Sequence, residues 1–167
     1  MNRPYFEEST KKILHHPDMI DIQAYYAQYK ASGLWILEYD KKSIGIIAID
    51  ANPESESNPD AKKRSKKPLS SSVAVIRHFY VDEPYRPTQI QDDLLRHAVK
   101  HAFSSDPTLD RIEARDSPLT RYAQQSLKSA GFRLEQHTET VGLFRWKLGT
   151  RVLERAEWKK SEEASET

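Results

Sequence analysis

A strand, a short acidic turn and an amphipathic helix follow one another between Val73 and Phe103. β-Branched and aromatic residues dominate 73–81, and apolar residues recur with helical spacing over 90–103. The N–H groups in the first turn of a helix have no partner inside the helix and point toward whatever binds there. The sequence therefore predicts a site for an anionic group, such as a phosphate, at residues 88–92.

His78 lies near the end of this strand and is the best candidate for a general base. The ordinary pKa of a histidine is close to physiological pH, which suits proton transfer. Strict alternation places His78 on the same face as Ile76 and Tyr80, so a packed or surface histidine is the alternative interpretation. Glu38 and Asp50 are further acids that would act through water, and a solvated strand residue is the simpler meaning of each.

The elements around this stretch follow from hydrophobic periodicity and turn residues. We expect a single domain over 1–153 and a charged, disordered tail over 154–167. Within the domain, the patterns predict helices over 4–15, 18–30, 90–103 and 118–131, strands over 34–40, 43–51, 73–81 and 111–117, a mobile polar loop over 52–72, and a final hairpin made of 132–136 and 139–148.

Composition narrows the classes of function. The 167 residues carry 26 Lys and Arg against 25 Asp and Glu, so no global field favours nucleic acid. The chain has no cysteine, which excludes disulfides, thiolate metal sites and a cysteine acyl-enzyme. No run approaches the roughly 18 apolar residues of a membrane span.

The segment FYVDEPYRPTQIQDDLLRHAVKHA resembles the acetyl-CoA-binding segment of the GNAT N-acetyltransferases. Phe79, Tyr80 and Val81 match the strand end of that segment, and Arg86 matches the start of its pyrophosphate loop. The order of four segments over about 18–148 is similar to the family, including the terminal Gly131-Phe132 pair. The resemblance implies an α/β (α+β) fold with a mixed central sheet flanked by helices.

The resemblance also implies a reaction, namely acetyl transfer from acetyl-CoA, as co-substrate, to an unidentified primary amine. Without a cysteine nucleophile, direct attack in a ternary complex is the expected route. It implies that a backbone N–H at or near Val81 polarises the thioester. The site residues that we expect are His78 and Tyr122 for catalysis and, for cofactor binding, Phe79, Tyr80, Val81, Arg86, Pro87, Thr88, Gln89, Ile90, Gln91 and Asp92.

The phosphate loop departs from the family pattern. Three glycines are usual there, and this chain has Pro87, Gln89 and Gln91. Glycine tolerates positive φ and close approach of a ligand, whereas proline has no N–H to offer. Asp92 and Asp93 suit a helix N-terminus but would repel an anion. A non-catalytic GNAT-like binding or scaffold module is therefore the alternative function.

The next helix differs from the family at its usual acid. The family commonly has a tyrosine four residues before the Gly of Gly-Phe, and here that residue is Leu127. Tyr122 lies five residues earlier, about 140° away around the helix axis, so it can replace that tyrosine only with a different geometry. Ser117, just before Pro118, is expected to be the N-cap of this helix.

The first strand of the family is expected to be missing, because the chain opens with helices. This opening is similar to a membrane-tethered subgroup that includes fungal proteins. That resemblance implies a possible tether upstream of the chain and an intracellular location on the cytoplasmic side of a membrane. His97 and His101 have metal-ligand spacing, but no third ligand accompanies them, so we expect no metal. The basic run KKRSKK at 62–67 would contact nucleic acid or anionic lipid, or is simply a solvated loop.

Overall fold

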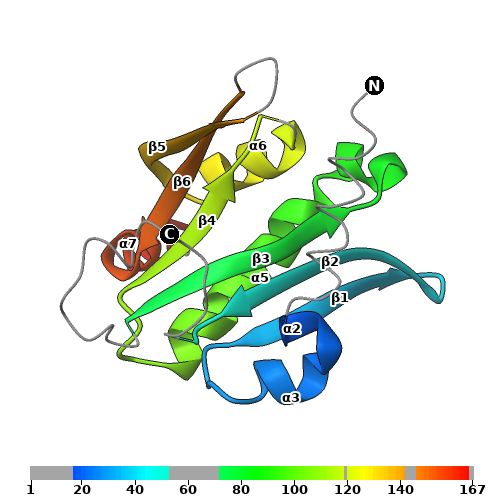
Figure 1. The fold of residues 1–167 in the computed structure, drawn as a ribbon, viewed down its shortest axis with the longest axis horizontal. Helices are drawn as coiled ribbons and strands as arrows, with labels where there is room; N and C mark the ends of the chain where they lie inside the picture. The colour runs from blue at the N-terminus through cyan, green and yellow to red at the C-terminus, as the bar shows by residue number, and fades with distance from the viewer. Residues whose placement is uncertain (1–16, 53–71, 119, 142–145, 166–167) are drawn as a thin grey trace.

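The computed structural model describes residues 17–52, 72–118, 120–141 and 146–165. Its centre is a six-stranded sheet in the order β1-β2-β3-β4-β6-β5 (Figure 1). Strands β3 and β4 pair in parallel and the other neighbours pair antiparallel. The strands are β1 (Gly33–Tyr39), β2 (Lys42–Asp50), β3 (Val73–Val81), β4 (Arg111–Asp116), β5 (Arg133–Val141) and β6 (Trp146–Glu154).

The helices cover both faces of this mixed sheet, so the expected fold class is confirmed. They are α2 (Pro17–Ile20), α3 (Ile22–Tyr26), the 3-10 helix η1 (Glu83–Thr88), α5 (Ile90–Ser105), α6 (Arg121–Ser129) and α7 (Arg155–Ser165). Helix α5 runs behind the sheet, whereas α2 and α3 lie in front of β1 and β2 (Figure 1).

The main core lies between α5 and the sheet. Leu95, Ala98 and Val99 of α5 are fully buried, as are Ile47 and Ile49 of β2. These side chains belong to one cluster, which follows from the helical spacing of the apolar residues in α5. Burial of this face fixes α5 against β2 and so fixes where the helix begins.

Two turns have the conformations that their residues favour. Asp40 and Lys41 both have positive φ, 48° and 62°, and the pair Tyr39 and Lys42 closes the β1–β2 hairpin. This is the two-residue turn in which Asp is favoured. Gly131 has φ +91°, directly after α6, as expected for a helix C-terminus.

Helix α6 begins later than the sequence suggested, and the prediction that Ser117 is its N-cap is wrong. Thr120 is the N-cap, and its backbone N–H donates to the carbonyl of Ser117 at 3.1 Å. This hydrogen bond closes a turn that starts at Ser117 and has Pro118 at its second position, which proline favours. The helix follows this turn.

The helix expected over 18–30 is two short helices. The chain breaks at Asp21, whose φ of −140° is not helical and whose side chain accepts a 3.0 Å hydrogen bond from the Ala24 N–H. Aspartate often caps a helix in this way, and here the cap ends α2 and begins α3. The break turns Asp18 toward the sheet, where it is fully buried.

The C-terminal part also differs from expectation. Strand β6 extends to Glu154 because it pairs with β4, with Glu154 opposite Arg111. The segment expected to be a disordered tail contains α7, which is anchored by Trp158 (6% exposed) beside Phe103 and by Arg155, whose guanidinium donates to the Leu109 carbonyl at 2.6 Å. The predicted missing first strand, the helix over 4–15, most of the loop over 52–72 and the KKRSKK run lie outside the described residues.

Candidate active site

Strands β3 and β4 separate beyond their fourth pair. They are paired from Val73 opposite Arg111 to Ile76 opposite Ala114, and β3 then continues to Val81 without β4 beside it. On its other side β3 stays bound to β2, where the Asp82 N–H donates to the Ile44 carbonyl at 2.8 Å. Backbone groups of alternate residues point to opposite edges of a strand. The carbonyl of Phe79 and both backbone groups of Val81 therefore face the side that β4 has left.

A bulge lies where the two strands begin to separate. Ile46 pairs with Tyr80 and Ala48 pairs with Arg77, so two residues of β3 stand opposite the single residue Ile47. One of the two is His78, which has φ +43°, an uncommon value for a residue other than glycine. A bulge redirects side chains and is common beside functional sites.

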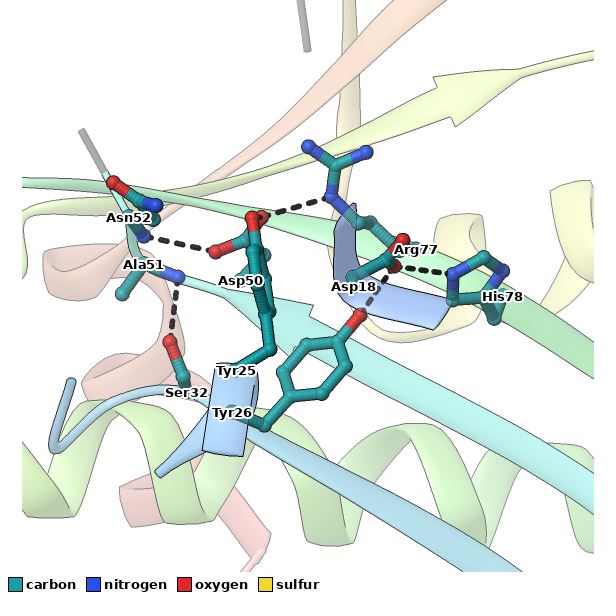
Figure 2. Close-up of polar contacts among 9 residues, drawn as sticks. All are labelled: Asp18, Tyr25, Tyr26, Ser32, Asp50, Ala51, Asn52, Arg77 and His78. Carbon is teal, nitrogen blue, oxygen red and sulfur yellow. Dashed lines mark hydrogen bonds and ion pairs between the residues drawn. The ribbon is translucent and has the colours of Figure 1, made fainter. Parts of the chain in front are cut away.

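The bulge overturns the prediction from strict alternation. Ile76 packs in the core cluster with α5, whereas His78 contacts α2 on the opposite face. Its Nε2 lies 2.6 Å from Oδ2 of Asp18 (Figure 2). Tyr26 of α3 donates to the same oxygen at 2.8 Å. His78 thus has a buried carboxylate partner that the sequence did not indicate.

A second acid lies beside this group. Asp50 of β2 is 1% exposed and accepts hydrogen bonds from Tyr25 Oη and from Arg77 Nε, each at 2.9 Å (Figure 2). Its other oxygen accepts from the Asn52 N–H at 2.9 Å. These bonds make Asp50 the structural partner of Arg77, and the simpler interpretation of Asp50 as a solvated strand residue is wrong because the side chain is buried.

Both tyrosines of this group stay protonated well above neutral pH. Burial, followed by the nearby Asp50 carboxylate, raises the pKa of Tyr25 to about 12. Burial and the hydrogen bond to Asp18 raise the pKa of Tyr26 further. Each hydroxyl is therefore a hydrogen-bond donor to its carboxylate.

Tyr122 of α6 reaches the free edge of β3. Its hydroxyl donates to the Phe79 carbonyl at 3.4 Å, and the Val81 backbone is a further hydrogen-bond partner. Burial raises the pKa of Tyr122, against the lowering effects of Arg86 and of the Val81 bond. Leu127, at the position of the family's usual tyrosine, is 2% exposed and belongs to the core. Tyr122 lies at the β3 edge because α6 packs beside this edge.

Arg86 also binds this edge. Its Nε donates to the Val81 carbonyl at 2.8 Å, and its guanidinium carbon lies 4.1 Å from the centre of the Tyr122 ring. The Tyr80 ring is 5.6 Å from the same carbon. The side chain of Arg86 thus contacts the strand edge, and its expected contact with pyrophosphate stays a prediction.

The turn before α5 takes a shape that usually needs glycine. Gln89 has φ 59° and ψ 19°, the left-handed conformation, although it is not glycine. It follows η1, which contains Pro87, and Thr88 donates its hydroxyl back to the Tyr85 carbonyl at 2.6 Å. The backbone at Gln89 therefore takes a left-handed conformation without glycine, and the Gln89 side chain is exposed to solvent.

The start of α5 only partly suits a phosphate. Ile90 is half-buried against the core, and its first-turn position leaves N–H groups for an anion. Gln91 is 6% exposed and its Nε2 donates to the Arg86 carbonyl at 3.2 Å. Among the described residues, Gln91 Oε1 and Asp92 Oδ1 are buried without a hydrogen-bond partner. These are acceptors, so an anion fits at the backbone N–H groups rather than beside these two side chains.

The structure brings Phe79, Val81, Arg86 and Tyr122 together at one strand edge, whereas His78 lies at the adjoining bulge with its side chain against α2. It adds Asp18 and Tyr26, which sequence reasoning missed because each approaches His78 only through the fold. His97 and His101 lie apart from this site, with ring centres 6.1 Å and 5.1 Å from that of Trp35. No group of three or more potential metal ligands occurs within the part of the chain that the structure describes.

The sequence and the fold are both similar to those of known proteins. The family model described as the acetyltransferase (GNAT) family matches residues 2–132. No curated protein matches the sequence. In the described ranges, no helix has the length and apolar character to span a bilayer. The matched relatives do not support the resemblance to a membrane-tethered fungal subgroup.

Solved structures share the fold at low sequence identity. A GNAT-family acetyltransferase from Streptococcus pneumoniae has a TM-score of 0.62 and 15% identity, covering 80% of this chain and 72% of that one. Spermidine N-acetyltransferase SpeG from Vibrio cholerae has a TM-score of 0.58 and 12% identity, covering 84% and 76%. Aminoglycoside acetyltransferase AAC(6')-Ib, solved with coenzyme A, has a TM-score of 0.56 and 18% identity, covering 89% and 77%.

Proposed function

Since the chain belongs to the GNAT family of acetyltransferases, we propose that it transfers an acetyl group from acetyl-CoA to a primary amine. The observation that carries this proposal is the β3 edge. Beyond the bulge at His78, the Phe79 carbonyl and the Val81 backbone are free of β4 and face Tyr122 and Arg86. The end of β3 thus combines a hydrogen-bond donor for a carbonyl and a candidate acid at its free edge with a candidate base at the adjoining bulge.

In this proposal the Val81 N–H polarises the thioester. Attack by an amine places negative charge on the carbonyl oxygen, and a fixed backbone donor stabilises that charge without rearranging. The hydroxyl of Tyr122 contacts this backbone group in the structure. It would therefore have to move away from the N–H before the N–H can donate to the thioester oxygen. The hydroxyl would then lie beside the reacting carbonyl.

The amine must be neutral to attack. A lysine-like amine has a pKa of about 10.4, so its deprotonation at pH 7 costs roughly 4.6 kcal/mol at ~1.36 kcal/mol per unit. His78 is the candidate base, because its side chain is only 22% exposed at the bulge of β3 and is held by Asp18. Positioning of the two reactants supplies up to ~7–11 kcal/mol in addition.

Tyr122 is the candidate acid for the departing thiolate. Burial keeps its hydroxyl protonated at neutral pH. The chain has no cysteine to form an acyl-enzyme, which supports direct attack in a ternary complex. Collapse of the tetrahedral intermediate would break the carbon–sulfur bond, and the Tyr122 proton would go to the sulfur.

The cofactor phosphates would bind at the start of α5. The dipole of this 16-residue helix and the N–H groups of Ile90 and Gln91 favour an anion, whereas the N–H groups of Gln89 and Asp92 already donate to backbone carbonyls. The guanidinium of Arg86 would add charge after leaving the Val81 carbonyl. That carbonyl would then be available to an amide of the pantetheine arm. Tyr80, Pro87 and Gln89 complete the proposed contact surface.

The acceptor class follows from neighbours only by analogy. Two proteins of the same fold are described as acetyltransferases of spermidine and of aminoglycosides, and both compounds carry primary amines. We take these amines as the first members of an acceptor panel. The upstream membrane tether and the cytoplasmic location stay predictions.

Release of the CoA thiol tests the proposal. A thiol-reactive dye reports CoA without background from the protein, which has no cysteine. We expect amine-dependent release with at least one member of a panel containing spermidine, an aminoglycoside and a lysine peptide. The His78→Gln variant should lower kcat by about 10²–10⁴-fold, the usual contribution of a general base.

The matched control is His97→Gln, which changes an exposed histidine on α5 and should leave kcat unchanged. Equal rates in His78→Gln and the wild type would refute the role of His78. Absence of amine-dependent release across the panel, although acetyl-CoA binds by calorimetry, would limit the protein to cofactor binding.

The second candidate function is a non-catalytic binding module. One observation favours it, since Arg86 and Tyr122 already occupy the hydrogen-bonding groups of the β3 edge. In a module these contacts are permanent and close the site. Calorimetry with acetyl-CoA distinguishes the two functions: no heat and no thermal shift at millimolar acetyl-CoA would support the module.

A further inference from the structure

We propose that Asp18 is a positioning residue for His78. Its carboxylate holds the imidazole in one tautomer, with the proton on Nε2, and leaves Nδ1 to accept the proton of the attacking amine. This inference rests on the proposed acetyl transfer. It joins two segments 60 residues apart in the sequence, helix α2 and the bulge of β3.

The contact is short and buried. The Asp18 Oδ2 and His78 Nε2 atoms are 2.6 Å apart, and the two side chains are 0% and 22% exposed. A carboxylate removed from water is strongly destabilised unless it accepts hydrogen bonds. Asp18 accepts at Oδ2 from both His78 and Tyr26, and the three side chains converge in Figure 2.

The second bond determines the direction of the first. The Tyr26 hydroxyl is protonated because burial and Asp18 raise its pKa, so it donates to Oδ2. An oxygen that already accepts from Tyr26 and lies 2.6 Å from a ring nitrogen accepts there too. The proton of the neutral imidazole is therefore on Nε2, and Nδ1 carries the lone pair.

The charges around His78 leave Asp18 as its direct partner. Among the described residues, Asp18 on α2 contacts the ring, and Tyr26 and Tyr25 on α3, Asp50 on β2 and Arg77 on its own strand lie in the same group (Figure 2). The charge of Asp50 is balanced by Arg77, whose Nε lies 2.9 Å from Oδ2. In the neighbourhood that the structure describes, Asp18 is the acid bonded to the imidazole.

The backbone of β3 independently supports this role. His78 has φ +43° at a bulge, a conformation that is strained for a side chain with a Cβ. The bulge is what directs the imidazole toward α2 instead of the α5 core. Strained backbone that serves one contact is a recurrent property of functional sites.

The experiment compares two changes at Asp18 and reads the ring directly. Asp18→Asn removes the charge and keeps an acceptor, whereas Asp18→Ala removes both. We would record the ring ¹⁵N signals of the whole chain by NMR, assigning His78 with His78→Gln. The same proteins would be assayed for CoA release with the fastest amine of the panel, from pH 5 to 9.

We expect the wild-type ring to be the Nε2–H tautomer and the Asp18→Ala ring to be a mixture of tautomers. Asp18→Asn should lower kcat about 10-fold and Asp18→Ala about 100-fold, less than the ~10²–10⁴-fold for loss of a base. The acid limb of the kcat profile should move to lower pH in both variants, because a carboxylate stabilises the imidazolium. KM for the amine should not change.

A pair of tyrosine variants serves as the matched control. Tyr26→Phe and Tyr25→Phe each remove one hydroxyl that donates to a buried acid, at 2.8 Å and 2.9 Å. Only Tyr26→Phe should move the His78 signals and the acid limb. Both tyrosine variants retain the Asp18 carboxylate. The comparison therefore tests whether the hydrogen bonds at Asp18 orient the His78 ring even if the Asp18 variants do not fold.

A wild-type ring in the Nδ1–H tautomer would overturn the proposal. So would unchanged kcat and acid limb in Asp18→Asn, which would make the contact purely structural. If the wild type binds acetyl-CoA but acetylates no amine, the proposed function fails and with it the catalytic role of Asp18. The NMR result would still report the tautomer, so the two failures are distinguishable.

Discussion

Removal of the Tyr122 hydroxyl distinguishes a catalytic role of this group from a structural one. Its bond to the Phe79 carbonyl is 3.4 Å long, beyond the 2.5–3.0 Å that is usual for hydroxyl donors. Removal of such a bond costs at most about 1 kcal/mol of folding free energy. The Arg86 guanidinium contacts the ring, 4.1 Å from its centre, and a phenylalanine ring would keep that contact.

We therefore expect Tyr122→Phe to fold normally and to lose catalysis. A change of about 1 kcal/mol moves Tm by roughly 2–4 °C in a chain of this size. Loss of a general acid lowers kcat by about 10²–10⁴-fold, equivalent to ~3–5 kcal/mol in the barrier. Because burial raises the pKa of Tyr122, wild-type activity should fall only at strongly alkaline pH, and the variant should lack this alkaline limb.

The assay combines thermal unfolding with CoA release at saturating acetyl-CoA and amine. Tyr39→Phe is the control, because Tyr39 is 62% exposed on β1 and the change should alter neither quantity. A kcat for Tyr122→Phe within about threefold of the wild type would refute the acid role. A large fall in Tm together with kcat would instead identify Tyr122 as a structural contact of α6 with β3.

Three further predictions concern stability and the loop. Asp116→Ala breaks the buried ion pair with Arg151, whose Nε lies 2.6 Å from Asp116 Oδ1, and should lower the free energy of unfolding by about 3–5 kcal/mol in chemical denaturation. An equal loss in the Asp116→Leu/Arg151→Met double variant, which leaves no buried charge unpaired, would contradict this explanation. Gln89→Gly should bind acetyl-CoA several-fold tighter by calorimetry. The stability of the protein should change little, because relief of the ~1 kcal/mol left-handed strain at Gln89 offsets the conformational entropy that glycine adds to the unfolded chain. Weaker binding would mean that the Gln89 side chain contacts the cofactor. The pKa of Tyr25 is raised from 10.0 to about 12, so its contribution to the free energy of unfolding is complete below pH 10 and is lost as the pH rises to about 12. In Tyr25→Phe the free energy of unfolding should therefore fall less between pH 10 and 12. An unchanged pH dependence would exclude Tyr25 as the source of the alkaline loss of stability.

Local patterns account for the parts of the fold that were predicted. Alternating β-branched residues predicted β3 with its observed bounds, and helical spacing predicted α5 to within two residues of its end. Turn chemistry located the β1–β2 hairpin and Gly131 after α6. Each of these signals acts between residues close in the chain, where propensity and side-chain period decide the conformation.

The errors arose where distant contacts override local preference. The charged segment after residue 154 looks solvated in sequence, yet Arg155 binds the carbonyls of Leu109 and Phe103, and Trp158 packs beside Phe103. Strand β6 extends because β4 offers it hydrogen bonds, and no property of its own sequence marks that end. Ser117 has the side chain of an N-cap, but a proline turn intervenes before the helix.

The candidate site divides in the same way. The sequence alone determined the family resemblance, the strand that carries His78, and the helix whose N-terminus would bind phosphate, because these features are contiguous. Only the tertiary structure decided that the bulge turns His78 away from Ile76 and that Asp18, 60 residues distant, becomes its partner. It also decided that Tyr122 reaches the β3 edge. The physical reason is that a catalytic contact depends on where two elements pack, and packing is settled by the whole core.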